Sequence, residues 1–138
     1  MRRTITTLLT VGVLALPVAQ QAGAAVKTTK KVVTKKFAGA AYQAGRWGSL
    51  QVTITVRKTT TVRAGKKKVT RKITAVSVPT YPNHTDRSVY INSQALPILK
   101  SETLQAQSAH INLVSGATDS SDAFASSLQS AILKAKRS

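Results

Sequence analysis

The sequence is constrained most by two segments in which apolar and polar residues alternate, separated by a long basic stretch. The segments are residues 50–58 and 72–81, and a period of two is typical of strands with one buried face. The residues between them are polar and basic, and Gly65 is the only strong turn signal there. We therefore predict a long antiparallel hairpin with its tip near Ala64-Gly65 and arms that extend beyond the core. The predicted inward-facing residues are Val52, Ile54, Val56, Val76 and Val78.

The C-terminal segment carries apolar residues at helical spacing. Residues 120–122 are a Ser-Ser-Asp cluster that favours a helix start, and cations at Lys134, Lys136 and Arg137 would complement the helix dipole in the last turn. We predict an amphipathic helix that begins two to three residues after Thr118. Its predicted core stripe consists of Phe124, Leu128, Ile132 and Ala135, widened by Ala123, Ser127 and Ala131.

Residues 86–109 have helical spacing in pieces and follow a loop at residues 81–84. Because proline disrupts a helix interior but suits the first turn, we expect Pro97 to begin a new helix. The predicted fold class is α+β, a small antiparallel sheet with an extended basic hairpin, packed against helices that include the amphipathic C-terminal helix. The expected core residues of the middle segment are Leu96, Leu99 and Leu104.

The N-terminus has the features of an export signal. A basic Met1-Arg2-Arg3 precedes an uncharged, mostly apolar stretch at residues 5–19, and Ala22-Gly23-Ala24 fits a small-x-small cleavage site. We predict a secretory signal peptide at residues 1–24, with an uncleaved anchor as the alternative. Either way the working protein is expected outside the cytoplasm, secreted or within a bacterial cell envelope. Residues 25–40 are expected to be a basic linker or a frayed first strand, and residues 41–138 the functional domain.

The charge of the chain is strongly basic and unevenly distributed. The formal net charge is +17, from 21 Lys and Arg residues against 4 Asp and Glu residues. We predict an anion-binding patch on the hairpin, and a merely solvated hairpin is the alternative. The patch has no interleaved aromatic residue, so no specific nucleic-acid site is expected. The predicted basic patch consists of Arg57, Lys58, Arg63, Lys66, Lys67, Lys68, Arg71 and Lys72.

Several classes of chemistry have no support in the sequence. The chain has no cysteine, which excludes disulfides and thiolate chemistry, and His84 and His110 match no metal-ligand spacing. No Walker, dinucleotide-binding or nucleophile-elbow motif is present. We therefore expect neither a metal site nor a catalytic constellation, and the protein is a weak candidate for a stand-alone enzyme.

A series of short motifs in a fixed order nevertheless resembles a known family over about residues 41–136. The chain is similar to the small FMN-binding domain family, which includes the flavin-bearing periplasmic subunit of the sodium-pumping NADH–quinone reductase and short secreted FMN-binding proteins. After the strand pair, the matching elements are Ile91-Asn92, Ala95-Leu96-Pro97, Gln105-Ala106-Gln107-Ser108, Ser115 to Thr118, and Ser127-Leu128-Gln129-Ser130-Ala131.

The resemblance implies a covalent cofactor. In that family an Asp, two residues and Ser/Thr-Gly-Ala-Thr form a motif whose last Thr receives FMN through a phosphoester bond, made by a separate flavin transferase that uses FAD and magnesium. Thr118 would be the acceptor here, with Ser115, Gly116 and Ala117 as the rest of the motif, and Asn112 stands where the family has Asp.

Other residues are expected at the same site because of their chemistry. Ser120 and Ser121 could add hydrogen bonds to a phosphate near the helix start. Tyr42 and Trp47 could stack on the flavin ring, although such aromatic residues are more often part of a core or an interface. The implied partners are the flavin transferase and redox donor and acceptor proteins. The alternative function is a basic secreted protein that binds anionic cell-wall, membrane or nucleic-acid polymers.

Overall fold

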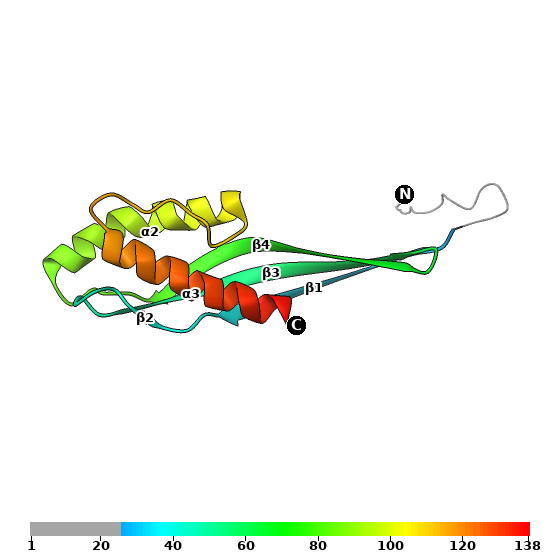
Figure 1. Ribbon diagram of the computed structural model, residues 1–138, viewed down its shortest axis with the longest axis horizontal. Coiled ribbons are helices and arrows are strands. Elements are labelled where there is room, and N and C mark those ends of the chain that lie inside the picture. The colour runs from blue at the N-terminus through cyan, green and yellow to red at the C-terminus, as the bar shows by residue number, and fades with distance from the viewer. Residues whose placement is uncertain (1–25) are drawn as a thin grey trace, which may run out of the picture. The chain divides into compact units, whose positions relative to one another are not determined.

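A computed structural model describes residues 26–138, so the predicted signal peptide at residues 1–24 lies outside the described residues. The described chain is an α+β fold with a four-stranded antiparallel sheet and two helices, as the sequence predicts (Figure 1). The elements are β1 (Thr28–Ala38), β2 (Tyr42–Gln43), β3 (Ser49–Arg63), β4 (Lys66–Thr80), α2 (Asp86–Ala106) and α3 (Thr118–Lys136).

The chain divides into two compact units, which we describe separately. The described part of the first unit consists of residues 26–31 and 59–69, and the second unit consists of Val32–Lys58 and Thr70–Ser138. Most of the segment 25–40, expected to be a linker or a frayed strand, forms β1, and its residues from Val32 onward belong to the second unit.

In the sheet, β3 pairs with each of the other three strands. Because β4 occupies one edge of β3, β1 and β2 share the other edge in succession. The antiparallel β2–β3 register pairs Tyr42 with Leu50 and Gln43 with Ser49. Between the two edge strands, the Gly39 N–H donates to the Val52 carbonyl at 2.8 Å, which continues the pairing through the break.

The hydrophobic core lies in the second unit, between one face of β3 and the two helices. Alternate residues of β3 are buried from Leu50 to Val56, as the period-two pattern predicts. Helix α3 runs beside α2 in Figure 1, and the two helices are in contact. The predicted stripe of α3 is confirmed: Phe124, Leu128 and Ala135 are buried with Ala123, Ser127 and Ala131, and Ile132 is partly buried.

Small residues let α3 approach the sheet closely. A Cβ atom at Gly39 would overlap the backbone carbonyl of Ser127, so only glycine fits there. The buried Ser127 hydroxyl accepts a hydrogen bond from the Val52 N–H at 2.8 Å. The Ser130 hydroxyl accepts one from Ala40 at 3.1 Å. Hydroxyls of the helix therefore satisfy backbone donors where regular strand pairing is interrupted.

Helix α2 differs from the prediction at two positions. Pro97 lies inside the helix, so the prediction that it begins a new helix is wrong. Pro97 and Ser93 are both exposed, which lets water reach the Ser93 carbonyl that loses its amide partner. Leu104 is 39% exposed, contrary to expectation, and Thr103 is buried in its place with its hydroxyl donating to the Leu99 carbonyl.

The C-terminal end of α2 is attached to the edge of β4 by one side chain. Gln107 has left-handed backbone angles, φ 54° and ψ 32°, and its N–H donates to the Thr103 carbonyl. Its Oε1 accepts from the Ile73 N–H at 2.8 Å, and its Nε2 donates to the Ile73 carbonyl at 3.0 Å. The side-chain amide thus pairs with β4 as a neighbouring strand would.

Neither helix in the described range, residues 26–138, combines the length and apolar character needed to cross a bilayer.

Candidate functional site

A pocket of about 270 Å³ lies where the first turns of the two helices meet in the second unit. Helix α2 contributes Arg87 and Ser88, and α3 contributes residues 118–120. In Figure 1 both helices begin at the same end of this unit. Because the N-terminus of a helix carries partial positive charge and free N–H groups, two such ends favour an anionic ligand.

The start of α3 is open to a ligand. The predicted start at residues 120–122 is too late, since α3 begins at Thr118 with Ala117 as its N-cap. Ala117 has no side-chain acceptor, so no capping hydrogen bond is made. The first helical N–H groups have no acceptor within the helix itself. By contrast, α2 is capped by Thr85, whose hydroxyl accepts from the Ser88 N–H at 3.0 Å.

The loop before α3 is fixed by hydrogen bonds that leave Thr118 exposed. The Ala117 N–H donates to the Val114 carbonyl at 3.0 Å. The Val114 N–H donates to the Ser121 hydroxyl, also at 3.0 Å. Gly116 has φ 83°, a left-handed angle that favours glycine, and open space surrounds the place of its missing side chain. Glycine is therefore needed here for the backbone angle.

Trp47 enters the pocket from the loop between β2 and β3. The Ala44 N–H donates to the Gly48 carbonyl at 2.7 Å, and the Trp47 N–H donates to the Ala44 carbonyl at 3.0 Å. The Arg46 guanidinium lies 5.1 Å from the centre of the Trp47 ring, which is cation–π distance. This tight loop holds the indole at the pocket beside the first turn of α3.

One lining residue holds a buried acceptor with no partner among the described residues. Asn92 is 2% exposed, and its Nδ2 donates to the carbonyls of Pro82 at 2.9 Å and Ser88 at 3.0 Å. These two acceptors fix the orientation of the amide, and its Oδ1 makes no hydrogen bond within the described protein. An unmet buried acceptor costs about 1–3 kcal/mol. A donor from a buried water or from a ligand would remove that cost.

The described lining residues carry one cation, Arg87, and one carboxylate, Asp119. The Asp119 carboxylate lies against the loop that holds Trp47, because a Cβ atom at Gly45 would be 2.5 Å from its Oδ2. A second hollow of about 370 Å³ adjoins the pocket and shares Arg87, Ile91, Gly116 and Ala117 with it. Both hollows are lined by Gly116 and Ala117, the residues that lead into Thr118.

The structure gathers some of the sequence-predicted site residues and separates others. Gly116, Ala117, Thr118 and Ser120 line the main pocket together with Trp47, and Ser115 lines the adjoining hollow. Ser121 is fully buried outside the pocket, where it holds the loop. Tyr42 is not with them, since it lines a separate hollow beside Gln129.

Asn112 is exposed and outside the main pocket. Its Nδ2 donates to the Glu102 carboxylate at 3.0 Å. An Asp side chain at this position would face Glu102 as a like charge. The amide at residue 112 therefore has a local partner in this protein.

The sequence indicates no ligand-binding role for five residues that line the pocket. They are Arg87, Ser88, Ile91, Asn92 and Asp119. Arg87 had a usable signal, because it is one of only two basic residues from residue 73 to residue 133. Asn92 also had one, because Ile91-Asn92 is among the elements that carry the family resemblance, whereas Ser88 had none.

The predicted basic patch is divided between the two units. Arg63 and Lys66 to Lys68 belong to the first unit, and the other four residues belong to the second. Lys58 Nζ and Arg71 Nη2 both donate to the Ser138 carbonyl, at 2.9 and 3.1 Å. Arg57 and Lys72 are exposed.

No protein-family model matches this chain, and no curated protein matches it either.

Proposed function

We propose that this protein carries FMN covalently on Thr118, outside the cytoplasm, and relays electrons between redox partners. The observation that carries the proposal is an exposed threonine hydroxyl at the first position of α3, an uncapped helix start that opens into a pocket with Arg87. A phosphate on this hydroxyl meets free backbone N–H groups, the positive end of the helix dipole and a guanidinium.

The attachment is a phosphoryl-group transfer without a change of redox state. Thr118 Oγ1 forms the new bond to the FMN phosphorus of FAD, and the pyrophosphate P–O bond breaks with release of AMP. The hydroxyl proton passes to a base on the flavin transferase, which also supplies the magnesium ion. The exposure of Thr118 and the fixed loop before it give such an enzyme access to the hydroxyl.

The remaining pocket residues suit the other parts of a flavin mononucleotide. Trp47 offers an aromatic face for stacking. Asn92 Oδ1 offers a fixed acceptor for an imide N–H or a ribityl hydroxyl. When bound, FMN supplies one- and two-electron transfer, and the protein holds the ring and adjusts its electrostatic surroundings. A covalent tether keeps the flavin in place where free FMN is dilute.

The test is the intact mass of the protein after coexpression with a flavin transferase. We expect an increase by one FMN less one water in the wild type and none in Thr118→Ala. Ser126→Ala is the matched control, because it removes an exposed hydroxyl from the same helix. An unmodified wild type, or equal modification of Thr118→Ala, would overturn the proposal.

A further inference from the structure

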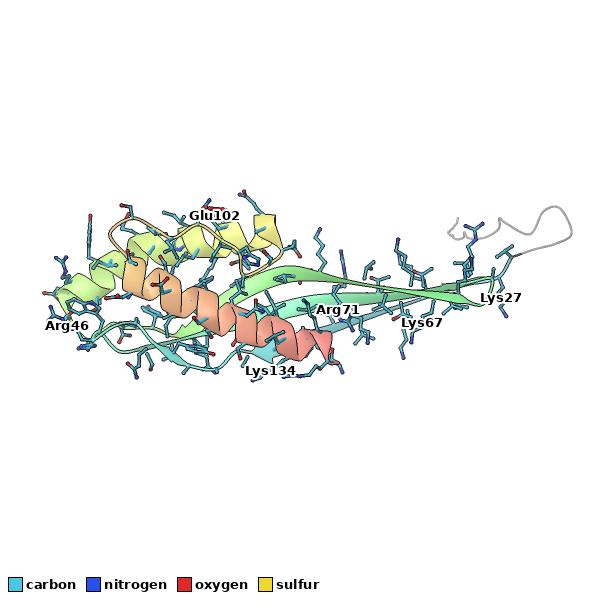
Figure 2. The ribbon with its side chains drawn as sticks, in the orientation of Figure 1. Lys27, Arg46, Lys67, Arg71, Glu102 and Lys134 are labelled. Atoms are coloured by element: carbon cyan, nitrogen blue, oxygen red, sulfur yellow. The ribbon has the colours of Figure 1, made fainter. Side chains whose placement is uncertain are left out.

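The described part of the first unit carries many positive charges close together and no negative charge. Residues 26–31 and 59–69 hold seven basic side chains and no Asp or Glu, so none of these cations has a partner within the described unit. All seven are exposed. Figure 2 labels two of them, Lys27 and Lys67. The seven are Lys27, Lys30, Lys31, Arg63, Lys66, Lys67 and Lys68.

The hairpin turn determines which face of the ribbon each cation occupies. Ala64 and Gly65 have φ 53° and 76°, a two-residue turn of the mirror-image type that matches strand twist. It places Arg63 opposite Lys66, and each further step pairs the next residues outward. Arg63, Lys66 and Lys68 therefore share one face, while Lys67 and Val62 share the other.

The placement of cations opposite each other lowers the stability of the hairpin. Like charges directly opposite each other on a sheet face are destabilising, and Arg63 and Lys66 are such a pair. Charges on one face are enough to protect a sheet edge from aggregation, so edge protection does not explain cations on both faces. In the second unit Lys58 and Arg71 are used structurally, because both donate to the Ser138 carbonyl. The cations of the first unit have no such role among the described contacts.

We infer that the first unit binds a flexible phosphodiester polymer without aromatic bases, of the polyol-phosphate class. Six of its seven cations are lysines, which bind phosphate as hydrated point charges and lack the planar fork of arginine. Threonine hydroxyls at residues 28, 29 and 59–61 add donors for phosphate oxygens. Residues two apart on a strand are about 7 Å apart, so an extended polyanion can contact them in succession.

Two other anionic partners fit less well. Single-stranded nucleic acid is usually held by aromatic stacking, and the described residues of this unit include no Phe, Tyr or Trp. A flat anionic bilayer meets one face of a ribbon, whereas the cations occupy both faces, and aromatic interfacial anchors are lacking here. A flexible chain can bend around the ribbon and neutralise both faces.

The experiment measures binding of the flavin-free full chain to fluorescent poly(glycerol phosphate) at several salt concentrations. One variant combines Arg63→Gln, Lys66→Gln, Lys67→Gln and Lys68→Gln. The matched control removes the same charge from the second unit, outside the predicted basic patch, with Lys35→Gln, Lys36→Gln, Lys100→Gln and Lys136→Gln. Thermal unfolding of both variants checks that they are folded. Since no flavin is involved, this result is independent of the proposed modification of Thr118.

We expect the first-unit variant to bind at least tenfold more weakly at low salt, with a salt dependence on log–log axes shallower by about 3, while the control changes much less. An equal loss in both variants would show a nonspecific effect of net charge and overturn the inference. Tighter binding of the wild type to single-stranded DNA, or to vesicles of anionic phospholipid, would overturn it in favour of that partner.

Discussion

At the scale of single residues, the pocket contains hydrogen-bonding groups that have no partner among the described residues. Thr118 opens a helix without a cap, and Asn92 has its amide nitrogen fixed and its oxygen unpaired within the described protein. Natural interiors rarely leave a buried acceptor unmet, and such exceptions are found at functional sites. The two residues line the same pocket.

Replacing Asn92 with alanine should lower stability. The buried Pro82 carbonyl would lose the donor that Asn92 Nδ2 provides, so we expect a loss of about 1–3 kcal/mol in the free energy of unfolding. Denaturant titration measures this change. Asn83→Ala in the adjacent loop is the control, because Asn83 is exposed and should change little. Equal stabilities of the two variants would contradict the assigned role of Asn92.

At the scale of elements, α2 and α3 are joined to the sheet by side chains that substitute for backbone partners. The Ser127 hydroxyl satisfies Val52 on β3, and the Gln107 amide satisfies Ile73 on β4. Each contact joins residues 34 or more positions apart in the chain. Such long-range contacts help to fix the position of each helix on the sheet.

The variant Gln107→Ala should loosen α2 from the edge of β4. It leaves the N–H and carbonyl of Ile73 without their partner, and we expect a loss of about 1–3 kcal/mol in the free energy of unfolding. Gln107→Gly separates this effect from backbone strain, since glycine relieves the left-handed conformation but still lacks the amide. Wild-type stability of both variants would rule out this attachment.

The parts of the fold that the sequence predicted correctly depend on local patterns. The alternation on β3, the turn at Ala64-Gly65 and the stripe on α3 are visible within single segments. The errors at Pro97 and Leu104 arose because exposure on α2 depends on which face meets the core. Similarly, the start of α3 was misplaced because Ser121 is used by Val114 in the preceding loop rather than as a cap.

The candidate site was predicted in part for the same reason. Thr118, Gly116 and Ala117 form one continuous motif, and the structure finds them in one pocket. Tyr42 and Trp47 are five residues apart, yet only Trp47 reaches that pocket, because a tight loop separates them. Arg87 and Asn92 lie on α2, and their place in the pocket depends on how α2 meets α3.

At the scale of the whole molecule, both units are basic, but the hydrophobic core and all four acidic residues lie in the second unit. Every core residue among the described residues belongs to the second unit. The described first unit contributes exposed cations, while Thr59 to Thr61, Val62 and Val69 are only partly buried. We therefore expect changes in the first unit to leave the core of the second unit intact.

A shortened hairpin should test this independence. Replacing residues 59–70 with Asn-Gly joins Lys58 to Arg71 through the preferred two-residue turn and removes no core residue. We expect cooperative unfolding with a free energy within about 1 kcal/mol of the wild type. Flavin attachment should be unchanged and polyanion binding weakened. Loss of cooperative unfolding, measured by circular dichroism, would contradict the independence of the second unit.

The uncapped start of α3 has a consequence for how the protein could be observed. The amide hydrogens of Thr118, Asp119 and Ser120 have no acceptor within the helix, so they should exchange rapidly with deuterated solvent. A phosphate seated over this turn would slow that exchange. The exchange rates of these amides would then measure occupancy of the site directly, without relying on the visible absorption of a cofactor.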